Sequence, residues 1–180
     1  VFGPGSYAVC SMAAGLALAA ADHVFAGNGK RAYALARPPG HHAQPDMADG
    51  YCFFNNIGVA IEALRNRGLE RAAVIDWDVH HGNGTQQGFY DDADVLTVSM
   101  HMNHGAWGAT HPQTGDVDEA GSGAGLGKNL NLPMPWGAGD EAYCRVFDEL
   151  VHGTGRRLAF RTGNKPQHRN KQVCKLPRHR

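Results

Sequence analysis

The chain has 180 residues, enough for one domain with a buried core, and its composition (42% hydrophobic, 19% charged) is typical of a globular protein. Seventeen Lys and Arg balance seventeen Asp and Glu, which excludes a strongly basic nucleic-acid-binding protein and an acidic disordered tail. The charges are nevertheless segregated. Residues 1–149 hold eight basic and seventeen acidic side chains, a charge of −9, whereas residues 150–180 hold nine basic and no acidic ones, a charge of +9.

Helix-like and strand-like segments alternate through the first 150 residues. Uninterrupted apolar strands separated by helices predict a parallel sheet flanked by helices, the α/β class. In such sheets the ligand site lies beyond the carboxyl ends of the strands, here at residues 37–56, 76–86 and 99–116. Ala/Leu-rich composition predicts a helix over 7–25, the spacing of apolar residues one over 56–67, and Asp140 as candidate N-cap one over 140–151. Short strand-like segments predict strands over 31–36, 72–77, 94–99 and 129–132.

Cysteine usage and hydropathy indicate the compartment. The four cysteines show no CxxC spacing, so we expect reduced thiols in a cytoplasmic protein. The longest apolar run, residues 12–21, is shorter than the ~20 residues of a membrane span. No basic segment precedes it, as one would in a signal peptide, and a helix outside the membrane is the favoured interpretation.

The most informative segment follows the predicted strand at 72–77. A buried strand is expected to end in neutral residues, yet Asp76, Asp78 and His80 alternate here, so in an extended chain they project to one face. Two carboxylates and an imidazole in a buried place repel and desolvate one another unless a cation lies among them. Mixed oxygen and nitrogen ligands suit zinc or ferrous iron. A solvated, acidic, His-rich turn is the plainer alternative.

A second group of polar residues follows the predicted strand at 31–36. The segment 37–42 reads Arg-Pro-Pro-Gly-His-His, so two adjacent histidines, His41 and His42, come after a rigid turn. Histidine carries protons near neutral pH, and a fixed pair beside a metal suggests acid–base chemistry. A His-His dipeptide alone is weak support for catalysis. Its place at a second strand end, on the same predicted edge of the sheet, strengthens the interpretation.

Three signatures then occur in order: Arg-Pro-Pro-Gly-His-His at 37–42, Gly-Tyr-Cys-Phe-Phe-Asn-Asn at 50–56 and Asp-Trp-Asp-Val-His-His-Gly-Asn-Gly-Thr at 76–85. With them the chain resembles the histone deacetylase superfamily from about residue 2 to residue 151, in particular its class II branch and the bacterial histone-deacetylase-like amidohydrolases. The resemblance implies an arginase/deacetylase-type α/β fold, incomplete at both ends of this chain. It also implies zinc-dependent hydrolysis of acetylated amines.

The resemblance implies a role for each matched residue. Asp78 and His80 would be zinc ligands. His41 and His42 would be the paired catalytic histidines, with His42 the general base for water and then the acid for the leaving amine. Asn83 would orient the ring of His42 without adding a charge, and so would raise its pKa less than an Asp would.

A structural potassium site is implied as well. Asp76 would hydrogen-bond to His41 and also belong to this site. The Ser99 hydroxyl would complete the shell together with the backbone carbonyls of Asp78, His80 and Met100.

The substrate tunnel of such enzymes needs apolar walls for an alkyl chain. Gly50 and Tyr51 match one wall, where many relatives carry Phe, and His111 stands where others carry the facing aromatic residue. Tyr and His are more polar than a Phe pair, so the substrate preference stays open. Ordinary loop residues are the alternative interpretation of these positions.

Two parts of the family's active site are not found in the sequence. A catalytic zinc site needs three protein ligands, and the family takes its third, an Asp, from a strand well downstream of 129–136. The family also uses a Tyr in a later Gly-rich loop to polarise the carbonyl. This chain has no Asp or Glu after Glu149 and no Tyr after Tyr143.

We therefore expect a partial deacetylase domain over 1–151 that folds poorly alone, followed by a basic tail over 152–180 of unrelated character. Three interpretations of the tail stay open. It is an out-of-frame translation, a basic arm for nucleic acid or an acidic partner, or a divergent but genuine end. The first is favoured because the composition changes so abruptly.

Two functions follow from these expectations. The first is a zinc deacetylase of acetyl-lysine in proteins or of acetylpolyamine-like small molecules. The second is a catalytically inactive remnant, or a binding module, that lacks the third metal ligand and the catalytic Tyr. Neither a membrane nor a nucleic acid is expected as partner, and the oligomeric state stays open.

Overall fold

The structure is a computed structural model that describes residues 3–103 and 114–157, with side chains up to residue 150. The chain divides into two compact units, Val1–Met134 and Pro135–Arg180. The first unit contains a sheet, helices and the predicted site. In the second, the described part is one helix, α4 (Asp140–Arg157), with Asp140 and Glu141 in its first turn. The predicted boundary at 151/152 stays a prediction.

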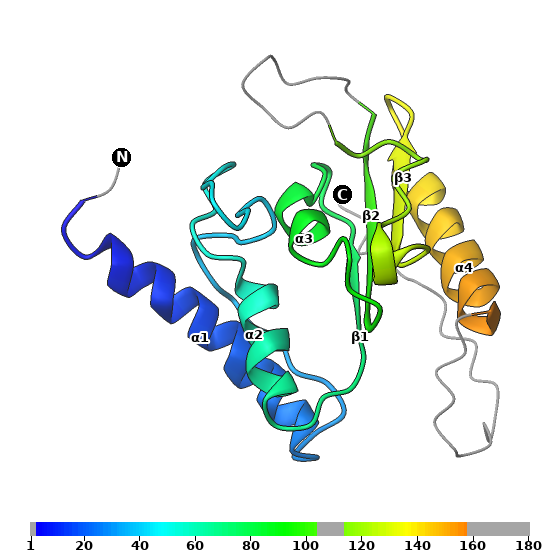
Figure 1. Ribbon diagram of the computed structural model, residues 1–180. Helices are drawn as coiled ribbons and strands as arrows, with labels where there is room; N and C mark the ends of the chain where they lie inside the picture. The colour runs from blue at the N-terminus through cyan, green and yellow to red at the C-terminus, as the bar shows by residue number, and fades with distance from the viewer. Residues whose placement is uncertain (1–2, 104–113, 158–180) are drawn as a thin grey trace, which may run out of the picture. The chain divides into compact units, whose positions relative to one another are not determined.

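A three-stranded parallel sheet forms the centre of the first unit. Its strands are β1 (Ala72–Asp76), β2 (Val95–Met102) and β3 (Asn129–Met134), in the order β1-β2-β3. All pairings are parallel, so the carboxyl ends of the three strands meet at one edge (Figure 1). The α/β class with a parallel sheet is thus confirmed.

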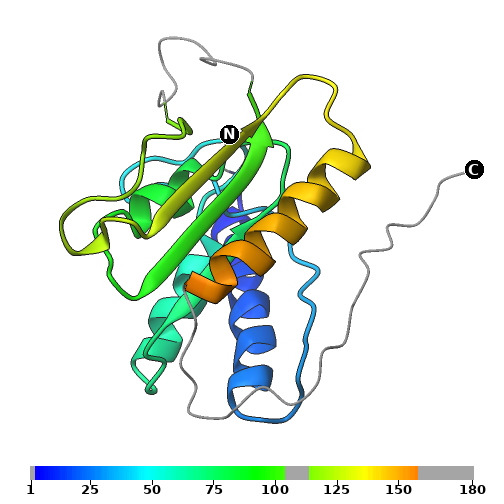
Figure 2. The same cartoon turned by 90° about the vertical axis from the view of Figure 1, so that its right-hand side faces the viewer.

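Three helices lie on the same face of this sheet (Figures 1 and 2). They are α1 (Ser6–Phe25), α2 (Asn56–Arg65) and α3 (Asn83–Gly88). The side chain of Asn55 caps α2 by accepting a hydrogen bond from the backbone N–H of Gly58 at 3.0 Å. The helices expected over 7–25 and 56–67 are confirmed.

The hydrophobic core of the unit joins the helices to the strands. Ile61 on α2, Val74 on β1, Val95 on β2 and Phe89 after α3 form one buried cluster. Burial in α2 is one-sided, because Ala60, Ile61 and Leu64 are buried at helical spacing while Ile57 is 45% exposed. The core thus fixes α2 and the end of α3 against the sheet.

The strand expected over 31–36 is wrong. This segment has no regular secondary structure, and Tyr33 and Leu35 are 84% and 80% exposed. A strand needs a neighbour to satisfy its backbone groups, and no described strand pairs with this segment. A sequence does not show whether a partner strand is present.

Helix α1 has the length and hydropathy of a membrane-crossing helix, by composition alone. The sequence expectation rested on the ten-residue run 12–21, whereas the helix extends well beyond that run. Mostly buried core helices pass the same test, and so do signal sequences, whereas only 17% of the apolar window of α1 is buried. The buried residues of α1 are Cys10, Ala13 and Ala14. Cys10, Cys52 and Cys144, the cysteines within the described residues, are free thiols.

The one-sided burial of α2 makes a stability prediction. Ile61→Ala should lower the free energy of unfolding by about 2–5 kcal/mol, because it leaves a cavity between α2 and the sheet. Ile57→Ala, on the exposed side of the same helix, is the matched control and should change it by about 0.5 kcal/mol or less. Urea denaturation followed by circular dichroism measures both. Equal losses would contradict the packing described above.

Candidate functional site

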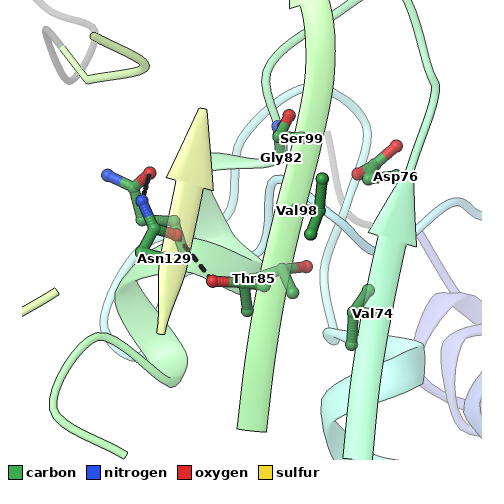
Figure 3. Close-up of a pocket in the computed structure, with 9 residues that line it drawn as sticks. Val74, Asp76, Gly82, Thr85, Val98, Ser99 and Asn129 are labelled. Carbon is green, nitrogen blue, oxygen red and sulfur yellow. Dashed lines mark hydrogen bonds between the residues drawn. The ribbon is translucent and has the colours of Figure 1, made fainter. Parts of the chain in front are cut away.

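The predicted site residues gather where β1 ends. Strand β1 stops at Asp76, whose register partner on β2 is Ser99, and both line a small pocket with Gly82 and Thr85 (Figure 3). His41, from the loop after residues 37–40, reaches this edge and contacts Asp76. Predicted site residues from 37–56, 76–86 and 99–116 thus lie together at the carboxyl ends of the strands.

Asp76 and His41 form the most tightly placed pair. Nδ1 of His41 donates to Oδ2 of Asp76 at 2.7 Å, and both side chains are largely buried, at 18% and 16% exposure. Gly82 makes the close approach possible, because a Cβ at this position would lie 2.5 Å from Oδ2 of Asp76. The predicted bond between His41 and Asp76 is present.

The pKa of His41 is raised above 6.5 by its surroundings. Burial alone lowers it, but the hydrogen bond and negative charge of Asp76, aided by the charge of Asp78, outweigh burial. The imidazolium form of His41 is therefore favoured at the end of the strand.

His42 has a different partner and the opposite pKa shift. Its Nδ1 lies 2.6 Å from Oδ1 of Asn83, the first residue of α3. Burial lowers the pKa of His42, and the positive charges of His41 and His80 add to that effect. The hydrogen bond to Asn83 and the more distant charge of Asp49 counteract it only in part. Neutral imidazole is thus the favoured form of His42.

Asp78 and His80 lie just beyond β1, in a turn that local bonds hold. The backbone N–H of Asp78 donates to Oδ1 of Asp76 at 3.0 Å, and that of His80 donates to Oδ1 of Asp78 at 2.8 Å. Nδ1 of His80 lies 3.0 Å from the same oxygen of Asp78. The three residues are thus linked at i, i+2 spacing, although the strand itself ends at Asp76.

Asp78 has the chemistry of a metal ligand. Burial raises its pKa, but the His80 backbone bond and the positive charges of His41 and His80 outweigh burial, so the net pKa is lowered. A carboxylate beside an imidazole is a donor pair that suits zinc. Within residues 3–103 and 114–157, however, no group of three or more His, Cys, Asp and Glu side chains is placed to hold a metal ion. The described donors fit zinc in kind and fall short in number.

Gly50 and Tyr51 form the centre of a tight turn below His42. Cys52 N donates to Asp49 O at 2.7 Å, and Gly50 and Tyr51 both have positive φ, 49° and 64°. These are the features of a type I′ turn, which is uncommon for Tyr. A Cβ on Gly50 would overlap the ring of His42, and Tyr51 is 87% exposed. The absence of a side chain at Gly50 therefore leaves room for the ring of His42.

His111, predicted as the facing wall, lies outside the described residues. Its role stays a prediction, as does the substrate role of Gly50 and Tyr51.

The sequence missed helix α3, which carries Asn83. Two of its six residues are glycines, which disfavour helices, so the sequence shows no helical pattern there. In the structure the N–H of Thr85 donates to the backbone O of His41 at 3.1 Å, and the Thr85 hydroxyl accepts from Asn55 at 3.1 Å. Gly84 packs directly on the backbone of Ala43. The run of polar and small residues after His81 was the available signal.

Comparison with known proteins gives a consistent result. A family model described as "Histone deacetylase domain" matches residues 1–159, slightly further than the sequence resemblance suggested. "Histone deacetylase 8" of Arabidopsis thaliana is 55% identical over 156 residues, covering 86% of this chain and 41% of the relative. "Histone deacetylase-like amidohydrolase" of Pseudomonas aeruginosa is 50% identical over 150 residues, covering 83% of this chain and 38% of the relative.

A solved structure agrees with these relatives. Acetylpolyamine aminohydrolase from Burkholderia pseudomallei superposes with a TM-score of 0.72 at 46% identity, covering 82% of this chain and 42% of that one. The chain thus spans about two fifths of the length of the relatives it matches.

The opposite pKa shifts can be tested in the metal-free chain. His41 should titrate above pH 6.5 and His42 below it. Because the pKa of His41 is raised, its bond to Asp76 stabilises the fold below pH 6.5, and this stabilisation is lost as pH rises through the pKa of His41. Asp76→Asn should lower the pKa of His41 below 6.5, since burial then dominates. NMR titration of the imidazole resonances measures this.

The matched control for that titration is Asp91→Asn, which removes an exposed carboxylate elsewhere in the same unit. It should leave the pKa values of His41 and His42 unchanged. An unchanged pKa of His41 in the Asp76→Asn variant would contradict the assigned bond.

Gly50→Ala should displace the ring of His42. Positive φ costs about 1–2 kcal/mol for a residue with a Cβ, and overlap with the ring adds about 1–3 kcal/mol. Gly27→Ala is the matched control, because Gly27 also has positive φ, 75°, but an open surrounding. Urea denaturation should show the larger loss for Gly50→Ala, and NMR should show loss of the His42–Asn83 bond in that variant alone. Equal losses would refute the close packing.

Proposed function

The chain belongs to the histone deacetylase family, and we propose that it provides the acid–base residues and part of the metal site of a hydrolase of acetylated amines. The main observation that supports this proposal is the pair of adjacent histidines with opposite pKa shifts, each held at Nδ1 by a different side chain. The substrates we propose are acetyl-lysine in proteins and acetylpolyamine-like small molecules.

His42 is the proposed general base. Oδ1 of Asn83 is an acceptor, so Nδ1 of His42 carries the hydrogen of their bond and Nε2 keeps its lone pair. A lowered pKa keeps this nitrogen unprotonated near neutral pH. Nε2 then takes a proton from the attacking water and returns it to the leaving amine.

His41 is the proposed source of positive charge. Its bond to Asp76 favours the imidazolium form beside the reacting carbonyl. A fixed cation there stabilises the negative charge that develops on the acetyl oxygen. Two chemically identical side chains thus take different tasks because their partners differ.

Zinc is the cofactor we propose for Asp78 and His80. When bound, it polarises the acetyl carbonyl and lowers the pKa of a water molecule toward neutrality. The two side chains adjoin each other and supply oxygen and nitrogen donors. A third protein donor has to come from beyond the described residues, so these two make up an incomplete ligand set.

Potassium is proposed for the edge between β1 and β2. Asp76 and Ser99 are register partners and line the same pocket (Figure 3). The Ser99 hydroxyl lies 2.9 Å from Nδ1 of His101 and 3.3 Å from Nδ1 of His81. This oxygen is a suitable donor for a hard cation, with the carbonyls of Asp78, His80 and Met100 as further oxygen donors.

A catalytically inactive binding module is the second candidate. It is favoured by the incomplete ligand set of the described residues. Such a module would bind zinc weakly and hydrolyse nothing. Its properties therefore differ measurably from those of the hydrolase.

Zinc binding and turnover test the proposal together. The chain should bind one zinc ion by calorimetry, and His80→Ala should weaken binding because it removes one of the two proposed ligands. Zinc-loaded chain should release acetate from N-acetyl-lysine amide or an N-acetylpolyamine. His23→Ala, an exposed histidine on α1, is the control and should change neither quantity. Zinc binding without any acetate release would refute the proposed hydrolase and favour the binding module.

A further inference from the structure

Helix α3 (Asn83–Gly88) is not a helix that its own sequence favours. It has six residues, two of which are glycines, and neither Asn nor Thr is a strong helix former. Isolated helices of this length are unstable in water. Contacts with the rest of the unit must therefore hold α3 in place, and with it the residue that orients His42.

Gln86 makes the contacts that fix α3 to the sheet. Its side chain is 6% exposed. Oε1 of Gln86 accepts from Nδ2 of Asn129 at 2.9 Å and from Nδ2 of Asn131 at 2.8 Å. Its Nε2 donates to Oε2 of Glu119 at 2.6 Å. All the polar atoms of this amide are thus used, and each partner comes from outside the helix.

These partners are themselves rigid. Asn129 and Asn131 alternate along β3, so both side chains project from the same face of the strand, and both are buried. Asn129 accepts a hydrogen bond from the Thr97 hydroxyl of β2 at 2.6 Å. Glu119 accepts the N–H of Gly115 at 2.8 Å with the same oxygen that binds Gln86. Gln86 is therefore tied directly to β3 and to a loop, and through Asn129 to β2.

The opposite end of the short helix meets the two histidines. Asn83 lies one turn before Gln86 and binds His42 at 2.6 Å. A shift of α3 by 1 Å would stretch that bond beyond hydrogen-bonding distance. The buried amide of Gln86 and the bond between Asn83 and His42 are thus two ends of one small rigid element.

We propose that Gln86 is a positioning residue for His42, acting through α3, and that Glu119 is the anchor that orients its amide. The inference rests on the proposed function of His42 as the general base. Gln86 touches neither histidine and is therefore not a catalytic residue. It determines where Asn83 stands, and hence which nitrogen of His42 faces the substrate.

Substitutions at positions 86 and 119 test this. Gln86→Glu places a second carboxylate against Glu119 and removes the donor, so α3 should shift. Glu119→Gln alone keeps an acceptor oxygen for Gln86 and Gly115 and should leave α3 in place. Gln86→Leu removes all three bonds. Gln87→Leu, the same change at the exposed neighbouring residue, is the matched control.

Two readouts are needed, and one does not depend on activity. In the metal-free chain, NMR detects the proton that His42 Nδ1 shares with Asn83. Its signal should be lost in the Gln86→Leu and Gln86→Glu variants and present in the wild type, Glu119→Gln and Gln87→Leu. In zinc-loaded chain, kcat should fall about tenfold or more in the two single variants at position 86, with KM within about twofold, because misplacement affects the proton transfer.

The outcomes separate the inference from the proposed function. A retained His42 signal in Gln86→Glu, or its loss in Gln87→Leu, overturns the inference. If Gln86→Leu does not fold, the comparison of Gln86→Glu with Glu119→Gln still decides. Wild-type chain without turnover refutes the proposed function, while the NMR comparison tests the position of His42 independently.

Discussion

The hydrogen bond between His41 and Asp76 is the constraint on which the site depends. A carboxylate at the end of a largely buried strand is unfavourable unless a donor or a cation compensates its charge. His41 supplies the donor at 2.7 Å, and Gly82 must lack a side chain to let the two groups meet. Because His41 is fixed in this way, the next residue, His42, packs against it, with ring centroids 4.0 Å apart.

The pKa values of the two histidines differ because each Nδ1 contacts a different side chain. Their pKa values would shift the same way if burial alone acted, because burial disfavours the charged form of both rings. A charged acceptor, Asp76, reverses the shift for His41. A neutral acceptor, Asn83, does not reverse the shift for His42. The amide at position 83 thus keeps the two rings chemically different, and this difference depends on the position of α3.

The sequence predicted the parts that depend on local pattern. Apolar runs located β1 and β2, Ala/Leu-rich composition located α1, and helical spacing located α2. Asp76, Asp78 and His80 were identified because their chemistry is unusual at a strand end, and Asn83 through the family resemblance. Their contacts, by contrast, are set by packing between segments distant in the chain. The strand expected over 31–36 failed for the same reason, since pairing depends on a partner that local sequence does not specify.

Helix α3 shows why the geometry of such a site cannot be predicted from its motif residues alone. Its propensity is poor, and besides its contacts with His41 and Asn55 it is held by amides and a carboxylate of β3 and the preceding loop, none of which belongs to a signature. Neutral amides suit this role, because buried charges near His42 would alter its pKa, whereas amides fix position and leave the charge unchanged. Glu119, the charged member, binds the far side of Gln86 and meets donors there. The acid–base residues are therefore tuned by one set of contacts and positioned by another, and a change in either set should be distinguishable from a change in the other.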